Sequence, residues 1–266
     1  MKIVETFVHM MSVSVVRYFF LAGLPFLLFY VLLPNYFSRF KIQERYASNK
    51  DFLREIWYSM QATFLFIVIT LLIWFTPIKE YTLIYDHVQD YPLWYMGLSV
   101  FLSLIIHDTY FYWLHRGLHS KFFYKKTHLV HHQSTNPSPW TAYSFHLLES
   151  IGEGMVLLVI VMILPMHRFN ILLFTIVAFG INVYGHLGYE IAPKWFRRTW
   201  LFEIMNTSVH HNLHHSKFIG NYGLYFRFWD RLMKTENPDY VKSYDALMAK
   251  RAEKKEIKQG LTPETV

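Results

Sequence analysis

The stretch WYSMQATFLFIVITLLIWFT, residues 57–76, decides the fold because it carries no charge over a length that suits a bilayer. An α-helix rises about 1.5 Å per residue, so this run crosses the roughly 30 Å hydrocarbon core of a membrane. The composition agrees, since 53% of the residues are hydrophobic and only 17% are charged, against about 25% charged in soluble domains. The sequence therefore predicts a membrane protein.

Further apolar runs predict an all-α, multi-pass membrane protein with four or five transmembrane or apolar helices. These runs cover residues 12–33, 93–114, 151–165 and 169–187. The run at 12–33 lacks the small-residue cleavage pattern of a signal peptide, so we expect it to be retained. The run at 151–165 is short and contains Glu153, which favours a half-buried helix over a full span.

The charged residues between the apolar runs predict an orientation. Residues 34–56 carry five basic side chains against three acidic ones, whereas residues 77–92 carry Lys79 against three acidic side chains. The positive-inside rule then places the first loop in the cytoplasm and the second outside. Following the chain from there, we expect the histidine-rich segments after residues 114 and 187 to lie on the cytoplasmic face. The net charge of +7 fits this topology, and no motif for binding nucleic acid accompanies it.

Three compact histidine boxes predict a metal centre. They are His115-x-x-x-His119, His128-x-x-His131-His132 and His211-x-x-His214-His215. Helix positions i, i+3 and i+4 share one face, so each box directs its imidazoles at one point. Imidazole suits zinc, copper, iron and nickel, and the absence of cysteine excludes thiolate-held sites. Because one metal takes four to six ligands, eight histidines imply two metals.

Other polar residues are candidates for supporting roles. His186 lies at the predicted inner end of the last span, and we expect it to be a ninth ligand. We expect His210 to support a ligand or to replace one. Asp108 is expected to accept a hydrogen bond from a ligand on another helix, or else to be a polar residue between helices. His146 and Glu149 either orient ligands or face interfacial water.

Four further histidines are not expected to bind the metal. His107 lies about 80° around its helix from His115, at 100° per residue. The other three, which lie on the predicted outer side, are His9, His87 and His167.

Several segments resemble the fatty acid hydroxylase/sterol desaturase superfamily of membrane di-iron oxygenases. They are DTYFYWLHRGLH at 108–119, residues 128–139, and the run from Asn206 to Thr235. The phrases STNPSPWTAYSFH and NYGLYFRFWDRL are most similar to the sterol C5-desaturase branch. One departure is Leu147, where that branch usually has a proline. The resemblance divides the chain into an N-terminal transmembrane region (1–92), a di-iron catalytic domain forming a cytoplasmic cap (93–236), and a charged cytoplasmic tail (237–266), in which 239–258 are expected to form a solvated helix.

The resemblance implies an O2-dependent oxidoreductase that desaturates or hydroxylates a lipid, with a sterol-like substrate favoured. Two iron ions would be held by the eight box histidines together with His186. A carotenoid or fatty-acid hydroxylase of the same superfamily is an alternative. From another class, a metal transporter or a zinc lipid hydrolase also remains open. The aromatic segments Tyr110–Trp113 and Tyr222–Trp229 either line the substrate route or pack as core and interfacial rings.

The sequence also implies a separate electron donor, because it has no Gly-x-Gly-x-x-Gly fingerprint for a dinucleotide. Cytochrome b5, or a ferredoxin with its reductase, would fit an acidic carrier docking on basic side chains. The alternative is that these side chains reflect membrane topology alone. They are Lys121, Lys125, Lys126, Arg197, Arg198 and Lys217. Both the endoplasmic reticulum and a bacterial inner membrane are compatible with these features.

Overall fold

The computed structural model describes residues 2–258, and the predicted all-α class is confirmed within that range. The longer helices are α1 (Lys2–Phe26), α3 (Asn49–Phe75), α4 (Leu93–Leu118), α6 (Leu147–Ile163), α7 (Arg168–Gly185), α9 (Ser208–Lys217) and α11 (Tyr240–Lys258). The short α-helices are α2 (Pro34–Phe37), α5 (Leu129–His132), α8 (Trp200–Ile204) and α10 (Phe228–Leu232). Two π-helical turns are η1 (Leu27–Leu32) and η5 (Tyr124–His128). The 3-10 turns are η2 (Ser38–Phe40), η3 (Pro77–Tyr81), η4 (Val88–Asp90), η6 (Pro139–Tyr143) and η7 (Lys194–Arg198).

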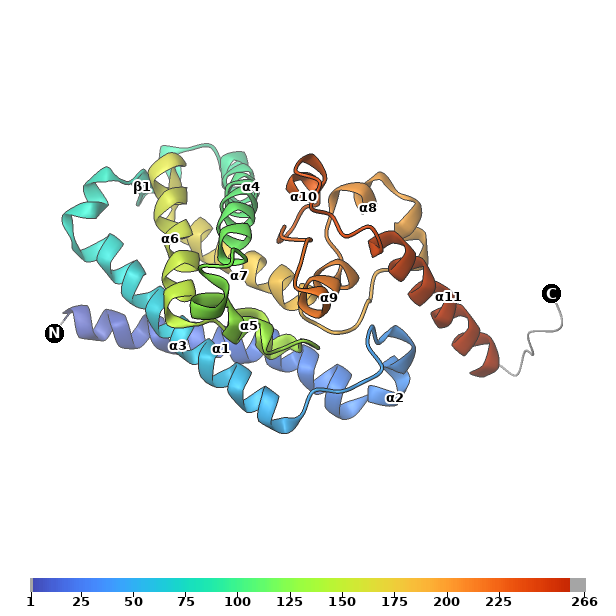
Figure 1. Ribbon diagram of the computed structural model, residues 1–266. Helices are drawn as coiled ribbons and strands as arrows, with labels where there is room; N and C mark the ends of the chain where they lie inside the picture. Colours follow the sequence, from blue (N-terminus) through green and yellow to red (C-terminus); the bar gives the residue numbers. More distant parts are fainter. Residues whose placement is uncertain (1, 259–266) are drawn as a thin grey trace.

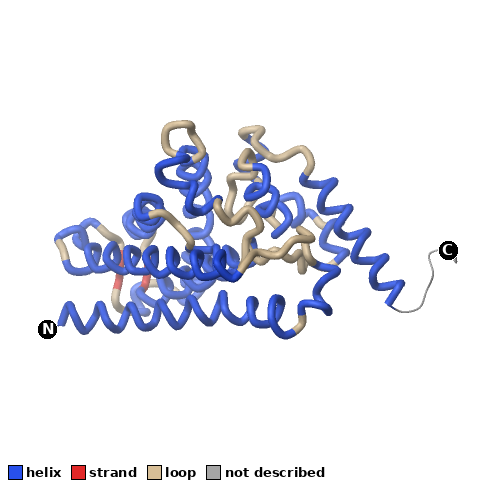
Figure 2. Tube along the Cα trace, turned by 60° about the horizontal axis from the view of Figure 1, so that its bottom comes forward, coloured by secondary structure: helices blue, strands red, loops and turns tan. Residues whose placement is uncertain are grey.

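The two long N-terminal helices, α1 and α3, lie side by side along one edge of the molecule (Figures 1 and 2). A capping box at Ser48 starts α3, because the Ser48 side chain accepts from the Asp51 amide while the Asp51 carboxylate accepts from the Ser48 amide. Helix α6 packs closely on α3 at Gly154, where an added Cβ would lie 2.6 Å from Cδ1 of Ile69. The missing side chain therefore sets the approach of these two helices.

The main hydrophobic core lies among α3, α4, α6 and α7, with residues such as Ile73, Ile160 and Phe174 almost fully buried. A short parallel pair, β1 (Ile84–Tyr85) with β2 (Met166–His167), ties the loop after α3 to the α6–α7 connection. Because α3, α4, α6 and α7 pack together in this core, the chain segments that follow these helices are held in fixed positions.

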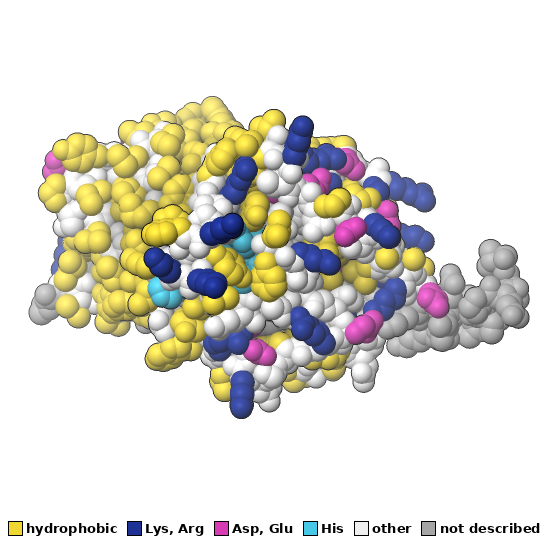
Figure 3. All heavy atoms as spheres, viewed as in Figure 1, with side chains coloured by type: hydrophobic (Ala, Val, Ile, Leu, Met, Phe, Trp, Pro, Cys, Tyr) yellow, Lys and Arg dark blue, Asp and Glu magenta, His cyan; other side chains and the backbone are white. Residues whose placement is uncertain are grey.

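Among residues 2–258, three helices are long and apolar enough to cross a membrane: α1 with η1 (Lys2–Leu32), α3 and α7. These are the features of an integral membrane protein. The runs predicted at 93–114 and 151–165 are helical too, as α4 and α6. However, α6 is 17 residues long and neither helix is among the three, so the expected count of four or five spans is not confirmed. Figure 3 shows apolar side chains covering the end of the molecule with α1 and α3, and Lys and Arg side chains gathered toward the other end.

The helix expected at 239–258 is confirmed as α11, but it is not solvated on all sides. Its buried side chains Tyr240, Tyr244 and Leu247 pack in a cluster with Phe202 and Val209. The tail therefore docks on the histidine-bearing half of the chain through an apolar stripe. Residues 259–266 of the predicted tail lie outside the described residues.

Candidate metal centre

All nine histidines expected to bind metal come together in two neighbouring clusters. The five-histidine cluster consists of His115, His119, His128, His132 and His214. The four-histidine cluster consists of His131, His186, His211 and His215. Within each cluster the donor nitrogens lie within 4.8 Å of one another. The two clusters divide the boxes between them, since His131 and His132 are neighbours in sequence but belong to different clusters.

Four chain segments deliver these histidines. His115 lies in the last turn of α4, and His119 caps the C-terminal end of that helix. His186 caps the C-terminal end of α7. The π-turn η5 runs directly into α5 and supplies the second box. Helix α9 supplies the third box, and its register is set by Thr207, whose side chain accepts a hydrogen bond from the amide of His210.

Six of the nine imidazoles have Nδ1 next to a hydrogen-bond acceptor. The acceptor is a backbone carbonyl for His115 (Tyr222, 2.9 Å), His131 (Ser144, 3.4 Å), His186 (Asn182, 2.9 Å), His214 (Gly220, 2.7 Å) and His215 (Ser134, 3.0 Å). For His128 it is the buried carboxylate of Glu149, at 2.6 Å. A carbonyl or carboxylate accepts only from N–H, so each contact keeps a proton on Nδ1 and leaves Nε2 as a lone-pair donor.

These Nε2 atoms face one another at short range. His211 and His186 are separated by 2.9 Å, and His115 and His128 by 3.0 Å, in each case between Nε2 atoms. Burial opposes protonation, since it lowers the pKa of His128, His131 and His211 well below 6.5. Lone pairs that converge without protons need a cation between them, so the donor set fits a metal in each cluster.

Glu149 takes the first of the two roles considered for it, because its carboxylate orients His128, one of the predicted ligands. His146 does not: it caps the start of α6, where its ring accepts from the amide of Leu148. Among the described residues, the histidines that were not expected to bind metal belong to neither cluster. His167 caps α7 and contacts the Asp86 carbonyl, and His107 contacts the Tyr225 hydroxyl at 2.9 Å.

Two supporting residues differ from expectation. His210 lies outside both clusters, with its ring edge against Tyr240 and neither ring nitrogen hydrogen-bonded. The reason is helical geometry, since position 210 lies one step off the face that His211, His214 and His215 share. Asp108 accepts from three backbone amides, those of residues 224 to 226, at 2.7–3.2 Å. Its expected bond to a ligand histidine is therefore wrong.

The segment that Asp108 holds is connected to the metal centre. The same loop supplies the Tyr222 carbonyl that fixes His115. A second buried carboxylate, Asp230, accepts from the amides of Tyr222 and Gly223. Both carboxylates therefore act on His115 through the loop. Sequence reasoning missed Asp230, although this residue lies in the quoted NYGLYFRFWDRL phrase. It also missed the backbone carbonyls that contact the histidines, because every residue has a backbone carbonyl and none is marked in the sequence.

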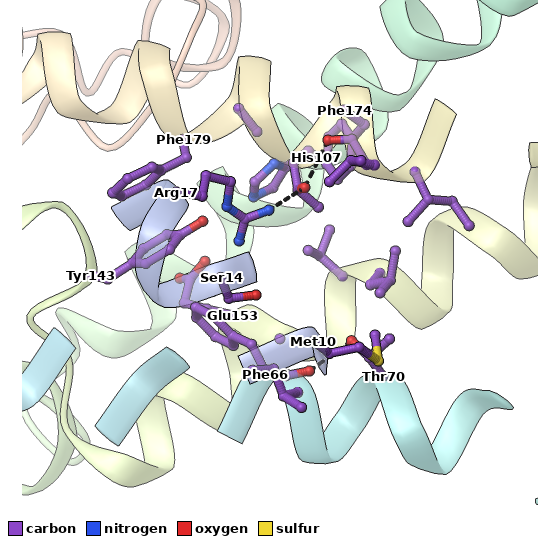
Figure 4. A pocket seen from close by; sticks show the side chains of 18 of the residues that line it. Met10, Ser14, Arg17, Phe66, Thr70, His107, Tyr143, Glu153, Phe174 and Phe179 are labelled. Carbon is purple, nitrogen blue, oxygen red and sulfur yellow. Dashed lines mark hydrogen bonds between the residues drawn. The ribbon is translucent and has the colours of Figure 1, made fainter. Parts of the chain in front are cut away.

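A mainly apolar cavity of about 530 Å³ lies among α1, α3, α4, α6 and α7 (Figure 4). Two of its walls touch the metal centre. The Phe111 ring lies 4.9 Å from the His115 ring, and the Phe145 ring 5.1 Å from the His131 ring, between centroids. The cavity thus ends one aromatic ring away from each histidine cluster. The aromatic segments considered for the substrate route contribute Phe111, Leu224 and Tyr225 to its lining.

The model of the family described as "Fatty acid hydroxylase" matches residues 100–235, a range that contains all nine histidines. The chain belongs to the fatty acid hydroxylase family. The match starts inside α4 and ends after α10, so α1, α3 and α11 lie outside the part that the family model matches.

Curated relatives of this family member are sterol enzymes by name. Human lathosterol oxidase is 29% identical over 181 residues, which is 67% of this chain and 59% of the relative. A Delta(7)-sterol 5(6)-desaturase of Gibberella zeae is 28% identical over 216 residues, 79% of this chain and 65% of the relative. The chain thus spans less than two thirds of the length of these relatives. No solved structure matches it.

Proposed function

We propose that this protein is a membrane-bound, O2-dependent di-iron oxidoreductase that desaturates or hydroxylates a lipid, with a sterol-like substrate favoured. The observation that carries the proposal is the position of two histidine clusters, each one aromatic ring from the end of an apolar cavity. The names of the sterol-oxidising relatives support the choice of substrate class.

The nine cluster histidines would hold the two iron ions, five imidazoles around one and four around the other. Iron, unlike zinc, supplies redox chemistry, so two bound irons would reduce O2 and provide the oxidising power to remove hydrogen from an unactivated C–H bond. The chain's own part is to keep every ligand neutral. In six of the nine, the carbonyls and the Glu149 carboxylate retain the Nδ1 proton, so that Nε2 remains available as a donor.

The cavity has the complementary role of binding and orienting the lipid. Its apolar walls exclude water from the path to the histidines and favour a long hydrocarbon body. Phe111 and Phe145 line the end of the cavity that is nearest to the clusters, so they would contact the reacting portion of the lipid. The lipid would enter from the bilayer in which α1, α3 and α7 are embedded.

Electrons would come from a separate acidic carrier, such as cytochrome b5 or a ferredoxin. His119, the one cluster histidine that is not buried, belongs to the same segment as Lys121, Lys125 and Lys126. Figure 3 shows histidine side chains at the surface among Lys and Arg side chains. With the loop charges discussed above, this arrangement supports a cytoplasmic position for the clusters in a multi-pass enzyme of the endoplasmic reticulum or a bacterial inner membrane.

The test is elemental analysis of the purified protein with Mössbauer spectroscopy after iron-57 loading, followed by incubation with a Delta(7)-sterol, reductant and O2 in nanodiscs. We expect two irons per chain, magnetically coupled, and O2-dependent oxidation of the lipid. Tightly bound zinc that iron cannot replace, with O2-independent lipid cleavage, would indicate a hydrolase. Metal flux across vesicles without lipid oxidation would indicate a transporter.

A further inference from the structure

The first half of α1 forms one wall of the apolar cavity. Its lining residues, three of which are labelled in Figure 4, are His9, Met10, Val13, Ser14 and Arg17. They recur every three or four positions, so they lie along one face of the helix. Val4, Val8 and Phe19 lie on the opposite face, and all three are exposed. The wall is therefore a single helix thick, with the lipid of the bilayer on its other side.

The two halves of α1 are held differently. The buried residues of this helix are Tyr18 and Ala22, both in its second half. There the Tyr18 hydroxyl donates to the Trp140 carbonyl, and an added Cβ at Gly23 would lie 3.2 Å from Cη2 of the Trp140 ring. By contrast, no side chain among residues 2–17 is buried. The second half of α1 is thus anchored in the core, and the first half only covers the cavity.

The cavity reaches the surface beside α7. Phe169 and Leu172 of this helix line the cavity and are also exposed. Among the described residues, no lining residue of α3 is exposed. On the α3 side the first half of α1 also has a packing contact, since the Phe7 and Phe64 rings lie 5.8 Å apart between centroids. The weaker border of the wall is therefore the one between α1 and α7.

A single hydrogen bond joins α1 to α7 across this border. The Arg17 guanidinium donates to the Thr175 hydroxyl, and both residues line the cavity. Within residues 2–258 the two helices form no other hydrogen bond, and Arg17 has no ion pair with a carboxylate. Arg17 lies midway along the Lys2–Leu32 span, where a charged side chain is costly and generally marks a functional position.

A contact made of one hydrogen bond can open and form again. Its loss costs far less than the separation of two packed helices, and the long Arg17 side chain can follow a small movement of α1. We propose that lipid enters the cavity from the bilayer between α1 and α7, and that the Arg17–Thr175 hydrogen bond closes this route. The first half of α1 moves away from α7 and keeps its contact with α3, while the anchored second half stays in place. That the entering lipid is a substrate rests on the proposed function.

Removing the Thr175 hydroxyl should open the route more often. Thr175→Val keeps the branched shape and loses the hydrogen bond, so the open population should rise about tenfold, the worth of one hydrogen bond to a charged donor. Distances between two spin labels on the full-length protein in nanodiscs measure that population. Because the chain has no cysteine, labels attach only to introduced ones. Val8→Cys with Leu173→Cys reports on α1 and α7, and Val8→Cys with Leu72→Cys reports on α1 and α3.

The three labelled positions are exposed and lie outside the cavity lining. We expect Thr175→Val to lengthen the α1–α7 distance and to leave the α1–α3 distance unchanged. Thr6→Val is the matched control, because the Thr6 hydroxyl bonds to the Lys2 carbonyl within α1 and the residue does not line the cavity. It should leave both distances as they are in the wild-type protein.

Cross-linking tests the route itself. A short cleavable linker between Arg17→Cys and Thr175→Cys should block uptake of a tritiated Delta(7)-sterol and of tritiated palmitic acid, and cleavage of the linker should restore it. The same linker between Phe7→Cys and Phe64→Cys joins α1 to α3 and should leave uptake unchanged.

Identical distances in Thr175→Val and the wild-type protein would overturn the inference. So would uptake that the α1–α7 linker does not slow, or that the α1–α3 linker blocks as well. If the variants for cross-linking do not fold, the distances in Thr175→Val still decide. These distances are measured without iron or O2, so a route that opens in a protein without lipid oxidation would refute the proposed function alone. A lipid-oxidising protein whose α1–α7 distance never changes would refute only this inference.

Discussion

The Glu149 carboxylate lies 2.6 Å from Nδ1 of His128, and both side chains are buried. We expect Glu149→Gln to lower metal affinity about 10- to 100-fold, because a neutral amide no longer holds the Nδ1 proton with a full charge. Metal retained after competition with a chelator measures the effect. Glu203→Gln, which removes an exposed carboxylate paired with Arg231, is the matched control. Equal retention by the two variants would contradict this role for Glu149.

The neighbours His210 and His211 offer a sharper comparison at the same scale. His211 belongs to the four-histidine cluster, whereas His210 faces Tyr240 with both ring nitrogens unpaired. We expect His211→Leu to lose metal. His210→Leu should retain it and be no less stable, since an unsatisfied buried polar group is removed. Elemental analysis and the thermal unfolding midpoint measure both variants, and loss of metal from His210→Leu would show that the cluster assignment is wrong.

At the residue scale, the convergence of these nine histidines was predictable and their division into two clusters was not. The i, i+3, i+4 spacing of the boxes placed His128 and His131 together on one face, yet the two residues belong to different clusters. That division depends on how α4, α7 and α9 meet in space. His186 was identified by its depth in the predicted span, whereas the carbonyl of Gly220 that holds His214 has no sequence signal.

At the scale of elements, the loop after α9 turns at Gly220, which has φ of +77°. An added Cβ would lie 2.5 Å from the backbone oxygen of Thr235, and backbone atoms cannot rotate away. We expect Gly220→Ala to displace this loop, weaken the bond from His214 to the Gly220 carbonyl, and cost about 1–3 kcal/mol of stability. Lower metal content and a lower unfolding midpoint would be measured together.

Gly117→Ala is the control for that substitution, since an added Cβ meets nothing within 4 Å at this glycine near the end of α4. It should leave metal content and stability unchanged or slightly improved. If Gly220→Ala behaved like Gly117→Ala, the turn would not be what positions His214.

The helices were predicted correctly where the sequence contains a long apolar run. Apolar runs correctly indicated α1, α3, α4, α6 and α7. The pair β1 and β2 has two residues in each strand, too few to show an alternation. The apolar stripe of α11 was missed because tyrosines at 240 and 244 are spread among charged residues. The attachment of loop 224–226 to Asp108 is a contact across more than a hundred residues, which no local pattern contains.

At the scale of the whole molecule, the buried histidines make stability depend on pH. Burial lowers the folded-state pKa of His132, His214 and His215 well below 6.5, while the unfolded chain protonates near 6.5. The unfolded state therefore binds more protons below pH 6.5, and the free energy of unfolding falls as the pH drops toward the folded-state values. We expect the metal-free protein to unfold at a lower temperature at pH 5.5 than at pH 8. An equal midpoint at both pH values would contradict this.

The two clusters are enclosed unequally: His119 in the five-histidine cluster is partly exposed, whereas every member of the four-histidine cluster is buried. Water and small chelators can reach the first cluster without any helix moving, but the second only when α9 separates from α7. A bound metal ion should therefore exchange at a different rate at each cluster. Exchange should be fast at the five-histidine cluster and limited by local opening at the four-histidine cluster. A brief chelator treatment would then leave a protein that holds one metal instead of two.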